Sequence, residues 1–262
     1  MPSRSSSGKK FRISIINCAP KNQELVSYYG KSISASQILA MKIRSYLPHL
    51  YDIKIHRPSL NPRDFPEPGS YDCVIIPGSR YDIDEAGRIA NPWMEDLLGF
   101  IKTTHKDSVP MLGICFGHQA IAVANGSKMM RVFPPQNVEL GLVQLELTRV
   151  GLKDPIMKGI PKKFCALEYH FRFIQIAPKG SVVLSYGPDK IIQSFRFGKT
   201  WGVQFHPDYN LKNVREMVER QKDKLSKSTD LSKLRLPIRW PGERQDNKVL
   251  KNFINVVSST KG

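Results

Sequence analysis

A cysteine between two glycines is the residue of this chain best suited to covalent chemistry. It lies in the run Gly113-Ile114-Cys115-Phe116-Gly117, after an apolar stretch typical of a buried strand and before a stretch typical of a helix. Hydrolases place a nucleophile on such a glycine-flanked turn, where the backbone can pack tightly around it. The dipole and free N–H groups of the following helix would favour the thiolate. We predict that Cys115 is a nucleophile and that Cys18, Cys73 and Cys165 are free thiols without a catalytic role.

A histidine at the end of another apolar strand is the candidate base. The segment Trp201-Gly202-Val203-Gln204-Phe205 is typical of a strand and leads into His206-Pro207-Asp208. A cysteine nucleophile is activated by an adjacent base, which a third group commonly orients. We predict that His206 activates Cys115 and that Asp208 orients the imidazole. The sequence has no Cys-x-x-Cys pair and no Cys/His group with zinc-site spacing, so we expect neither a metal nor a cofactor.

Alternating strands and helices must position these residues. Apolar stretches predict strands at 11–18, 51–56, 71–76 and 109–115, and helical patterns predict helices at 36–47, 92–104 and 119–124. This alternation indicates an α/β fold with a mostly parallel central sheet and helices on both faces. From 127 to 205 the pattern changes to successive strands, at 138–148, 182–185, 191–197 and 200–205. We expect these strands to form an antiparallel extension of the same sheet.

A length of 262 residues fits one domain with extensions. Residues 1–10 are basic and serine-rich, lack the apolar stretch of a signal peptide, and are expected to form a flexible tail. We expect the domain to span 11–225, with a helix at 211–225. Residues 226–262, which include an amphipathic stretch ending at Val257, should form an extension packed on the domain or trailing from it. No apolar run approaches the roughly 20 residues of a membrane helix, so we expect a soluble, cytoplasmic protein that does not bind membranes.

Taken together, the two motifs resemble the class I glutamine amidotransferase domain. The likeness is carried by Gly113-Ile114-Cys115-Phe116-Gly117-His118-Gln119 and Gly202-Val203-Gln204-Phe205-His206-Pro207, in this order and about 90 residues apart. It extends over roughly residues 11 to 220 and includes Ile76-Pro77-Gly78-Ser79 and Glu168-Tyr169-His170. The resemblance implies the flavodoxin-like fold of that family.

The resemblance also implies a reaction. Cys115 would attack the γ-carbonyl carbon of glutamine to give a thioester, while His206 would protonate the departing amine and later activate water. The family usually has glutamate two residues after the histidine, whereas this chain has Asp208, which is shorter by one methylene. The third contact of the triad is therefore expected to be longer, water-bridged or weaker.

Other site residues follow from the same resemblance, position by position. The backbone N–H groups of Phe116 and of Ser79, next to Gly78, match the donors of the oxyanion hole. Gln119 matches the glutamine that helps to hold the amino-acid end of the substrate. His170 belongs to a segment that lines the same pocket in relatives.

Two enzyme functions share this chemistry. The run Gly78-Ser79-Arg80-Tyr81-Asp82, followed by Asn91-Pro92-Trp93, is similar to the γ-glutamyl peptidases and to stand-alone amidotransferase-like proteins. This favours a hydrolase of glutamine or of a γ-glutamyl peptide or conjugate. The alternative is a glutaminase subunit that delivers ammonia to a separate synthetase, because the chain contains no fused synthetase domain.

A non-catalytic role is the third possibility, because the formal net charge is +17. A basic surface on an amidotransferase-like fold could bind a nucleic acid or an acidic protein. The lysines and arginines between 212 and 251 are interspersed with acidic residues, as on a solvated helix face. That pattern favours solubility over nucleic-acid binding, and the intact Cys115 and His206 argue against a degenerate site.

Overall fold

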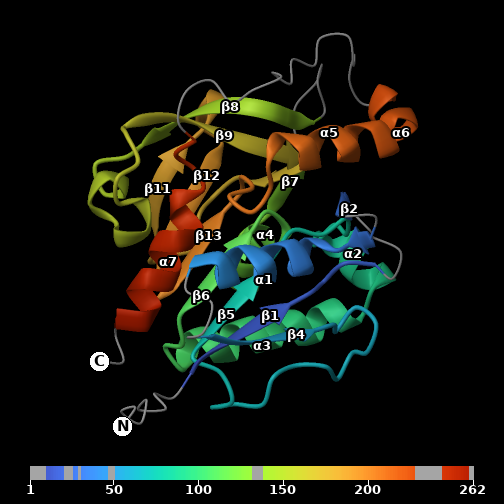
Figure 1. Cartoon of the computed structure of the whole chain (residues 1–262), viewed down its shortest axis with the longest axis vertical. Coiled ribbons are helices and arrows are strands. Elements are labelled where there is room, and N and C mark those ends of the chain that lie inside the picture. Colours follow the sequence, from blue (N-terminus) through green and yellow to red (C-terminus); the bar gives the residue numbers. More distant parts are fainter. Residues whose placement is uncertain are drawn as a thin grey trace, which may run out of the picture.

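A nine-stranded sheet forms the centre of the described part of the chain (Figure 1). The computed structural model describes residues 10–20, 26–28, 31–46, 51–131, 138–227 and 244–259. The strand order is β4-β1-β5-β6-β13-β12-β11-β8-β9. The strands are β1 (Phe11–Ile16), β4 (Tyr51–His56), β5 (Cys73–Ile76), β6 (Met111–Ile114), β8 (Glu139–Leu147), β9 (Lys163–His170), β11 (Val182–Tyr186), β12 (Ile192–Phe197) and β13 (Thr200–Val203).

Strand direction divides this sheet into two halves. β4, β1, β5, β6 and β13 run parallel to one another, whereas β12, β11, β8 and β9 pair antiparallel with their neighbours. This arrangement confirms the predicted α/β class and the antiparallel extension. The carboxyl ends of parallel strands meet at one edge of a sheet, where α/β proteins usually place their sites. β6 and β13 are direct neighbours there, with Gly113 paired to Gly202.

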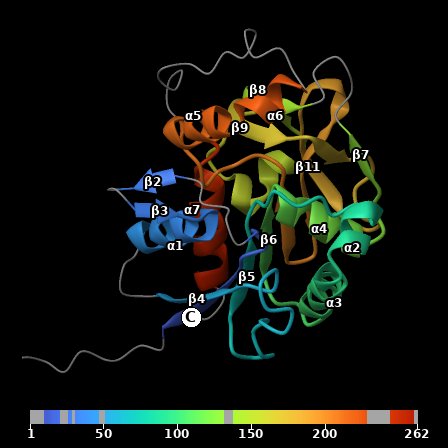
Figure 2. The same ribbon diagram turned by 90° about the vertical axis from the view of Figure 1, so that its right-hand side faces the viewer.

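Helices cover both faces of the parallel half (Figure 2). α1 (Ala35–Tyr46) and α7 (Lys248–Ser259) pack on one face, and α3 (Trp93–Lys106) and α4 (Phe116–Ala124) pack on the other. In β6, Leu112 and Ile114 join the apolar layer under α1 and α7, while Met111 joins the layer under α3 and α4. Successive strand residues point to opposite faces, so a strand buried on both sides needs the continuous apolar run seen here.

The helix α7 belongs to the main core although it lies far along the chain. Its apolar side chains are buried against the sheet, and the Phe253 ring meets Trp201 of β13 edge-on, with 5.8 Å between ring centroids. Asn252 Nδ2 donates to the backbone oxygens of Ile156 and Lys158. The amphipathic stretch predicted to end at Val257 therefore packs against the strand that leads to His206.

Shorter elements complete the structure. They are α2 (Glu85–Ala90), α5 (Leu211–Arg220), α6 (Lys222–Ser226), the hairpin of β2 (Val26–Tyr28) with β3 (Lys31–Ile33), the pair β7 (Met129–Arg131) with β10 (Arg172–Ile174), and 3-10 turns at Gly151–Lys153, Pro155–Met157 and Pro188–Lys190. The prediction of one continuous helix over 211–225 is wrong, because Gln221, at φ −115° and ψ 14°, leaves the helical region between α5 and α6. Residues 1–9 of the predicted basic tail lie outside the described residues. None of the helices in the described ranges is long and apolar enough to span a membrane.

Candidate active site

Cys115 occupies a strained turn between β6 and α4. Its backbone has φ 51° and ψ −102°, and it caps the N-terminus of α4. Positive φ is uncommon for a residue with a side chain and costs on the order of 1–3 kcal/mol, so the surrounding structure must hold it in place. Two bonds do so: Cys115 N–H donates to Val203 O over 2.8 Å, and Cys115 O accepts from Gln119 N–H over 3.1 Å. These bonds hold Cys115 at the carboxyl end of β6, directly before α4.

The two glycines that flank this turn are required by close packing. A Cβ on Gly117 would lie 2.0 Å from the backbone oxygen of Ile76 in β5, and a Cβ on Gly113 would lie 2.4 Å from the Gly117 carbonyl. Neither distance is tolerable, because the obstructing atoms belong to the backbone. The glycines therefore allow the first turn of α4 to press against β5 and β6. This places Cys115 beside the turn that follows β5.

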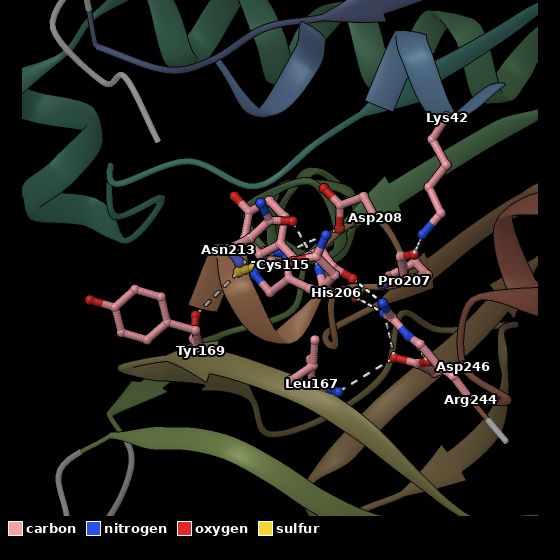
Figure 3. A network of polar contacts seen from close by, with 12 residues as sticks. Lys42, Cys115, Leu167, Tyr169, His206, Pro207, Asp208, Asn213, Arg244 and Asp246 are labelled. Carbon is pink, nitrogen blue, oxygen red and sulfur yellow. Dashed lines mark hydrogen bonds and ion pairs between the residues drawn. The ribbon is translucent and has the colours of Figure 1, made fainter. Parts of the chain in front are cut away.

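His206 lies next to Cys115 at the end of the neighbouring strand segment (Figure 3). Its Nδ1 is 3.3 Å from Asp208 Oδ1, and its ring stacks on Tyr209 with 4.2 Å between centroids and 3° between planes. The backbone N–H of His206 donates to Leu167 O over 2.8 Å. On the other side, a Cβ added to Gly78 would lie 2.8 Å from His206 Cε1 and 3.6 Å from Cys115 Cβ. The imidazole is thus held in one plane, with Nδ1 toward the carboxylate.

The charges at this site favour a protonated imidazole. Burial lowers the pKa of His206, but the Cys115 sulfur and the Asp208 carboxylate outweigh it and raise the pKa to about 10. His206 is 3% exposed and Asp208 is 2% exposed, so solvent screens these interactions little. A buried imidazolium between a sulfur and a carboxylate is the arrangement that stabilises a thiolate and stores a proton for a leaving group.

The predicted oxyanion-hole residues adjoin this pair. Phe116 is the first residue of α4, and N–H groups in a first helical turn have no partner within the helix. Ser79 follows Gly78, and its hydroxyl fixes the turn by donating to Cys18 O over 2.8 Å and accepting from Tyr81 N–H over 3.2 Å. The structure therefore brings Cys115, His206, Asp208 and Gly78 together, with Phe116 and Ser79 directly beside them.

Gln119 lies one helical turn beyond Cys115 and is 5% exposed. Its Nε2 donates to Arg172 O over 2.9 Å and to Gln204 Oε1 over 3.0 Å. Both amide hydrogens are thereby used within the protein. Gln119 can therefore interact with a substrate as a hydrogen-bond acceptor, through Oε1, and an ammonium group is a suitable donor.

His170, by contrast, is engaged by carboxylates. Its Nε2 lies 2.8 Å from Glu139 Oε2 and 3.2 Å from Glu168 Oε2. Burial lowers the pKa of His170, but these two partners have the larger effect and raise it to about 10. The ligand atoms of these three residues lie within 4.8 Å of one another, so they form the candidate metal group of the described residues. A protonated His170 between two carboxylates accounts for the same spacing without a metal. The predicted contact of His170 with substrate stays a prediction.

Three residues at the site were not predicted from the sequence. Tyr209 supplies the stacking surface for His206, and Tyr169 O lies 3.8 Å from Cys115 Sγ, within reach of the thiol proton before Cys115 ionises. Arg244 donates to the backbone oxygens of His206 and Tyr209. Tyr209 could have been suspected from its place just after His206 and Asp208. Tyr169 belongs to the segment Glu168-Tyr169-His170, which the resemblance placed at the pocket, although no role was predicted for it. Contacts to backbone atoms leave no signature in residue type or spacing, so Arg244 could not have been suspected.

The fold and this site define the class: an α/β protein with a cysteine on a strained strand-to-helix turn, facing a buried histidine. Residues 29–223 match the family described as "Glutamine amidotransferase class-I". The chain belongs to the class I glutamine amidotransferase family.

Individual proteins agree with this assignment. The chain is 31% identical over 157 residues to one subunit of the glutamine-hydrolysing GMP synthase of Ignicoccus hospitalis, covering 58% of this chain and 76% of that protein. It is 25% identical over 190 residues to gamma-glutamyl peptidase 5 of Arabidopsis thaliana, covering 70% and 73%. A crystal structure of a glutamine amidotransferase from Thermotoga maritima shares the fold, with a TM-score of 0.72 at 18% identity over 97% of this chain and 98% of that one.

Proposed function

We propose that this protein hydrolyses a γ-glutamyl amide bond, in glutamine or in a γ-glutamyl peptide, through a thioester on Cys115. The observation that carries the proposal is the strained Cys115 turn beside a buried His206 whose pKa is raised to about 10 by the sulfur and by Asp208. A non-glycine residue held at positive φ is costly, and strain of this kind clusters at active sites, where the surrounding structure maintains it.

The reaction proceeds in two halves. The Cys115 thiolate attacks the γ-carbonyl carbon, and the negative charge that develops on the carbonyl oxygen is stabilised by the N–H groups of Phe116 and Ser79. His206 then gives its proton to the departing nitrogen, so that ammonia or an amine leaves and a γ-glutamyl thioester remains. Neutral His206 next removes a proton from water. The resulting hydroxide attacks the thioester, which releases glutamate and restores the thiolate.

Each neighbouring residue has a defined place in this scheme. Asp208 holds Nδ1 of His206, which leaves Nε2 as the ring nitrogen that can exchange a proton with the leaving group and with water. Tyr209 keeps the ring in its plane. Gln119, whose Nε2 is already bonded, accepts from the α-ammonium group of the substrate through Oε1. A γ-glutamyl group is the part of the substrate that these contacts would select.

A partner-dependent glutaminase is the second candidate function. It is favoured by the 31% identity with a protein whose name describes one subunit of a glutamine-hydrolysing synthase. In that case ammonia would pass to a separate synthetase, and the isolated chain would turn over glutamine slowly. The gamma-glutamyl peptidase relative favours a chain that acts alone.

Covalent labelling tests the common chemistry. Wild type and Cys115→Ala are incubated with the glutamine analogue 6-diazo-5-oxo-norleucine and examined by intact mass. We expect one adduct on the wild type and none on Cys115→Ala; no adduct on either would refute a glutamine-shaped site in the isolated chain.

Release assays with glutamine and a γ-glutamyl dipeptide then separate the two functions. Turnover of the dipeptide supports a stand-alone peptidase. An adduct without turnover of either substrate supports the partner-dependent glutaminase.

A further inference from the structure

The backbone that follows the catalytic histidine is held by two cations from distant parts of the chain (Figure 3). Arg244 Nη2 donates to His206 O over 2.9 Å, and Arg244 Nη1 donates to Tyr209 O. Lys42 Nζ, from α1, donates to Pro207 O over 2.5 Å. Three carbonyl groups of the turn 206–209 are therefore bonded to positive side chains. The same turn carries His206, Asp208 and the stacked Tyr209.

Arg244 is itself fixed by a buried carboxylate. Its Nη2 lies 2.9 Å from Asp246 Oδ2, and Asp246 is 0% exposed. Asp246 Oδ2 also accepts from Leu167 N–H over 3.4 Å, and Leu167 O accepts from His206 N–H over 2.8 Å. The contacts form a closed ring from His206 through Leu167, Asp246 and Arg244 back to His206. A ring of this kind fixes the backbone of His206 from both its N–H and its C=O.

The two cations differ in how readily they lose their charge. Burial lowers the pKa of Lys42 to about 8, and the Arg244 charge acts in the same direction. Arginine stays charged at all relevant pH values, and its planar group can serve several acceptors at once, as it does here. Arg244 is thus the principal contact, and Lys42 assists it. Arg244 lies beyond residue 223, where the match to the amidotransferase family ends.

The contact that depends on this support is the one between His206 and Asp208. Its Nδ1 to Oδ1 distance of 3.3 Å is at the long limit of a hydrogen bond. A small movement of the turn would break it, and a displacement of roughly 1 Å in an active site can cost about 100-fold in rate.

We propose that Arg244, together with Asp246 and Lys42, is a positioning group that holds the 206–209 turn so that His206 faces Cys115 and Asp208 reaches His206. The proposal rests on the proposed function for its catalytic consequence, but the geometry of the Cys115 and His206 pair can be measured without any substrate. It makes a segment outside the family match a requirement for a working site.

The test compares Arg244→Lys and Arg244→Met with a matched control, Lys248→Met. Lys248 is a cation of the same segment that also donates to a backbone oxygen, but this oxygen belongs to Gly159, outside the 206–209 turn, at 3.2 Å. Arg244→Lys keeps a charge opposite Asp246, so it should stay folded even if Arg244→Met does not. Thermal unfolding is recorded for each variant.

The readout is the rate of iodoacetamide alkylation of Cys115 as a function of pH, followed by peptide mass. The partly exposed Cys165 serves as an internal reference for reagent and accessibility. We expect Arg244→Met to slow alkylation of Cys115 on the acid side by about 10- to 100-fold, with its pH profile moved to higher pH. Arg244→Lys should be intermediate, and Lys248→Met should match the wild type.

One result would overturn the proposal: a folded Arg244 variant whose alkylation profile coincides with that of the wild type. If the unfolding temperature of that variant is lowered, Arg244 is a purely structural residue. If the wild type forms no adduct with 6-diazo-5-oxo-norleucine and hydrolyses no γ-glutamyl compound, but the alkylation profile still depends on Arg244, the proposed function fails and the positioning role stands.

Discussion

Gly78 lies directly against His206, so a methyl group at this position tests how closely the residues of the proposed active site are packed. A Cβ there would stand 2.8 Å from His206 Cε1, whereas ordinary contacts begin at 3.4 Å. In Gly78→Ala the imidazole must therefore withdraw by about 0.6 Å. It cannot withdraw freely, because Tyr209 stacks on the ring with 4.2 Å between centroids.

The magnitude follows from this displacement. If roughly 1 Å of misplacement costs about 100-fold in rate, a shift of this size should cost on the order of tenfold. Overpacking of a buried site usually costs about 1–3 kcal/mol of stability, so the variant should remain folded. The loss should appear in thioester formation, because the ring moves relative to Cys115.

Gly99→Ala is the matched control. Gly99 is exposed in α3, and a Cβ there would meet no atom within 4 Å. Alanine is favoured over glycine in a helix by about 1 kcal/mol, so this variant should be as stable as the wild type or more so. The assay is the rate of inactivation by 6-diazo-5-oxo-norleucine, alongside thermal unfolding. A Gly78→Ala protein that reacts as fast as Gly99→Ala would refute the geometry of the site.

Three further predictions concern other parts of the structure. Asp208→Asn should lower kcat/KM for a γ-glutamyl substrate by up to about 10⁴-fold, because the amide does not stabilise the imidazolium of His206; equal rate constants would exclude Asp208 from the triad. Phe253→Ala should cost about 3–5 kcal/mol in urea unfolding, because the ring is buried against Trp201; an unchanged midpoint would mean that α7 does not stabilise the sheet. Burial lowers the pKa of His118 to about 3. Below about pH 6.5 the unfolded chain therefore binds a proton at His118, whereas the folded protein does not. As the pH falls from there toward 3, the free energy of unfolding of the wild type should decrease by about 1.4 kcal/mol per pH unit relative to that of His118→Gln. Parallel curves of stability against pH would contradict this.

Residue type and spacing predicted that Cys115 and His206 would act together, and the structure places them side by side because both follow apolar strands. β6 and β13 are parallel neighbours, so the residues after them meet at the same edge of the sheet. The glycines on either side of Cys115 were also informative, because a close backbone contact excludes a side chain at each of these positions.

Other elements could not be predicted from local pattern. β9 carries the charged residues Glu168 and His170, which are buried because they pair with each other and with Glu139 of β8. Charged residues at buried positions hide the apolar alternation by which a strand is recognised. The α2 helix is only six residues long and buries no side chain, so it lacks a periodic face, although Asp84 caps it by accepting from Gly87 N–H.

The ring of contacts through Arg244 could not be predicted from the sequence for a different reason. Arg244 and His206 are 38 positions apart, and the acceptor is a backbone oxygen. A carbonyl group is present at every position, so nothing in the sequence marks one as a partner. Tertiary structure alone pairs them.

The packing of α7 in the core also bears on how the protein is made. A ribosome delivers β6, α4 and β13 long before α7, so the apolar face that α7 covers stays open while the remaining chain is synthesised. Incomplete intermediates of this kind expose apolar surface, and they are the species that aggregate or engage chaperones. Synthesis that pauses after residue 223 would yield all the residues of the amidotransferase match but leave Trp201 uncovered and the turn at His206 without Arg244. Catalytic competence should therefore arise late, when α7 docks.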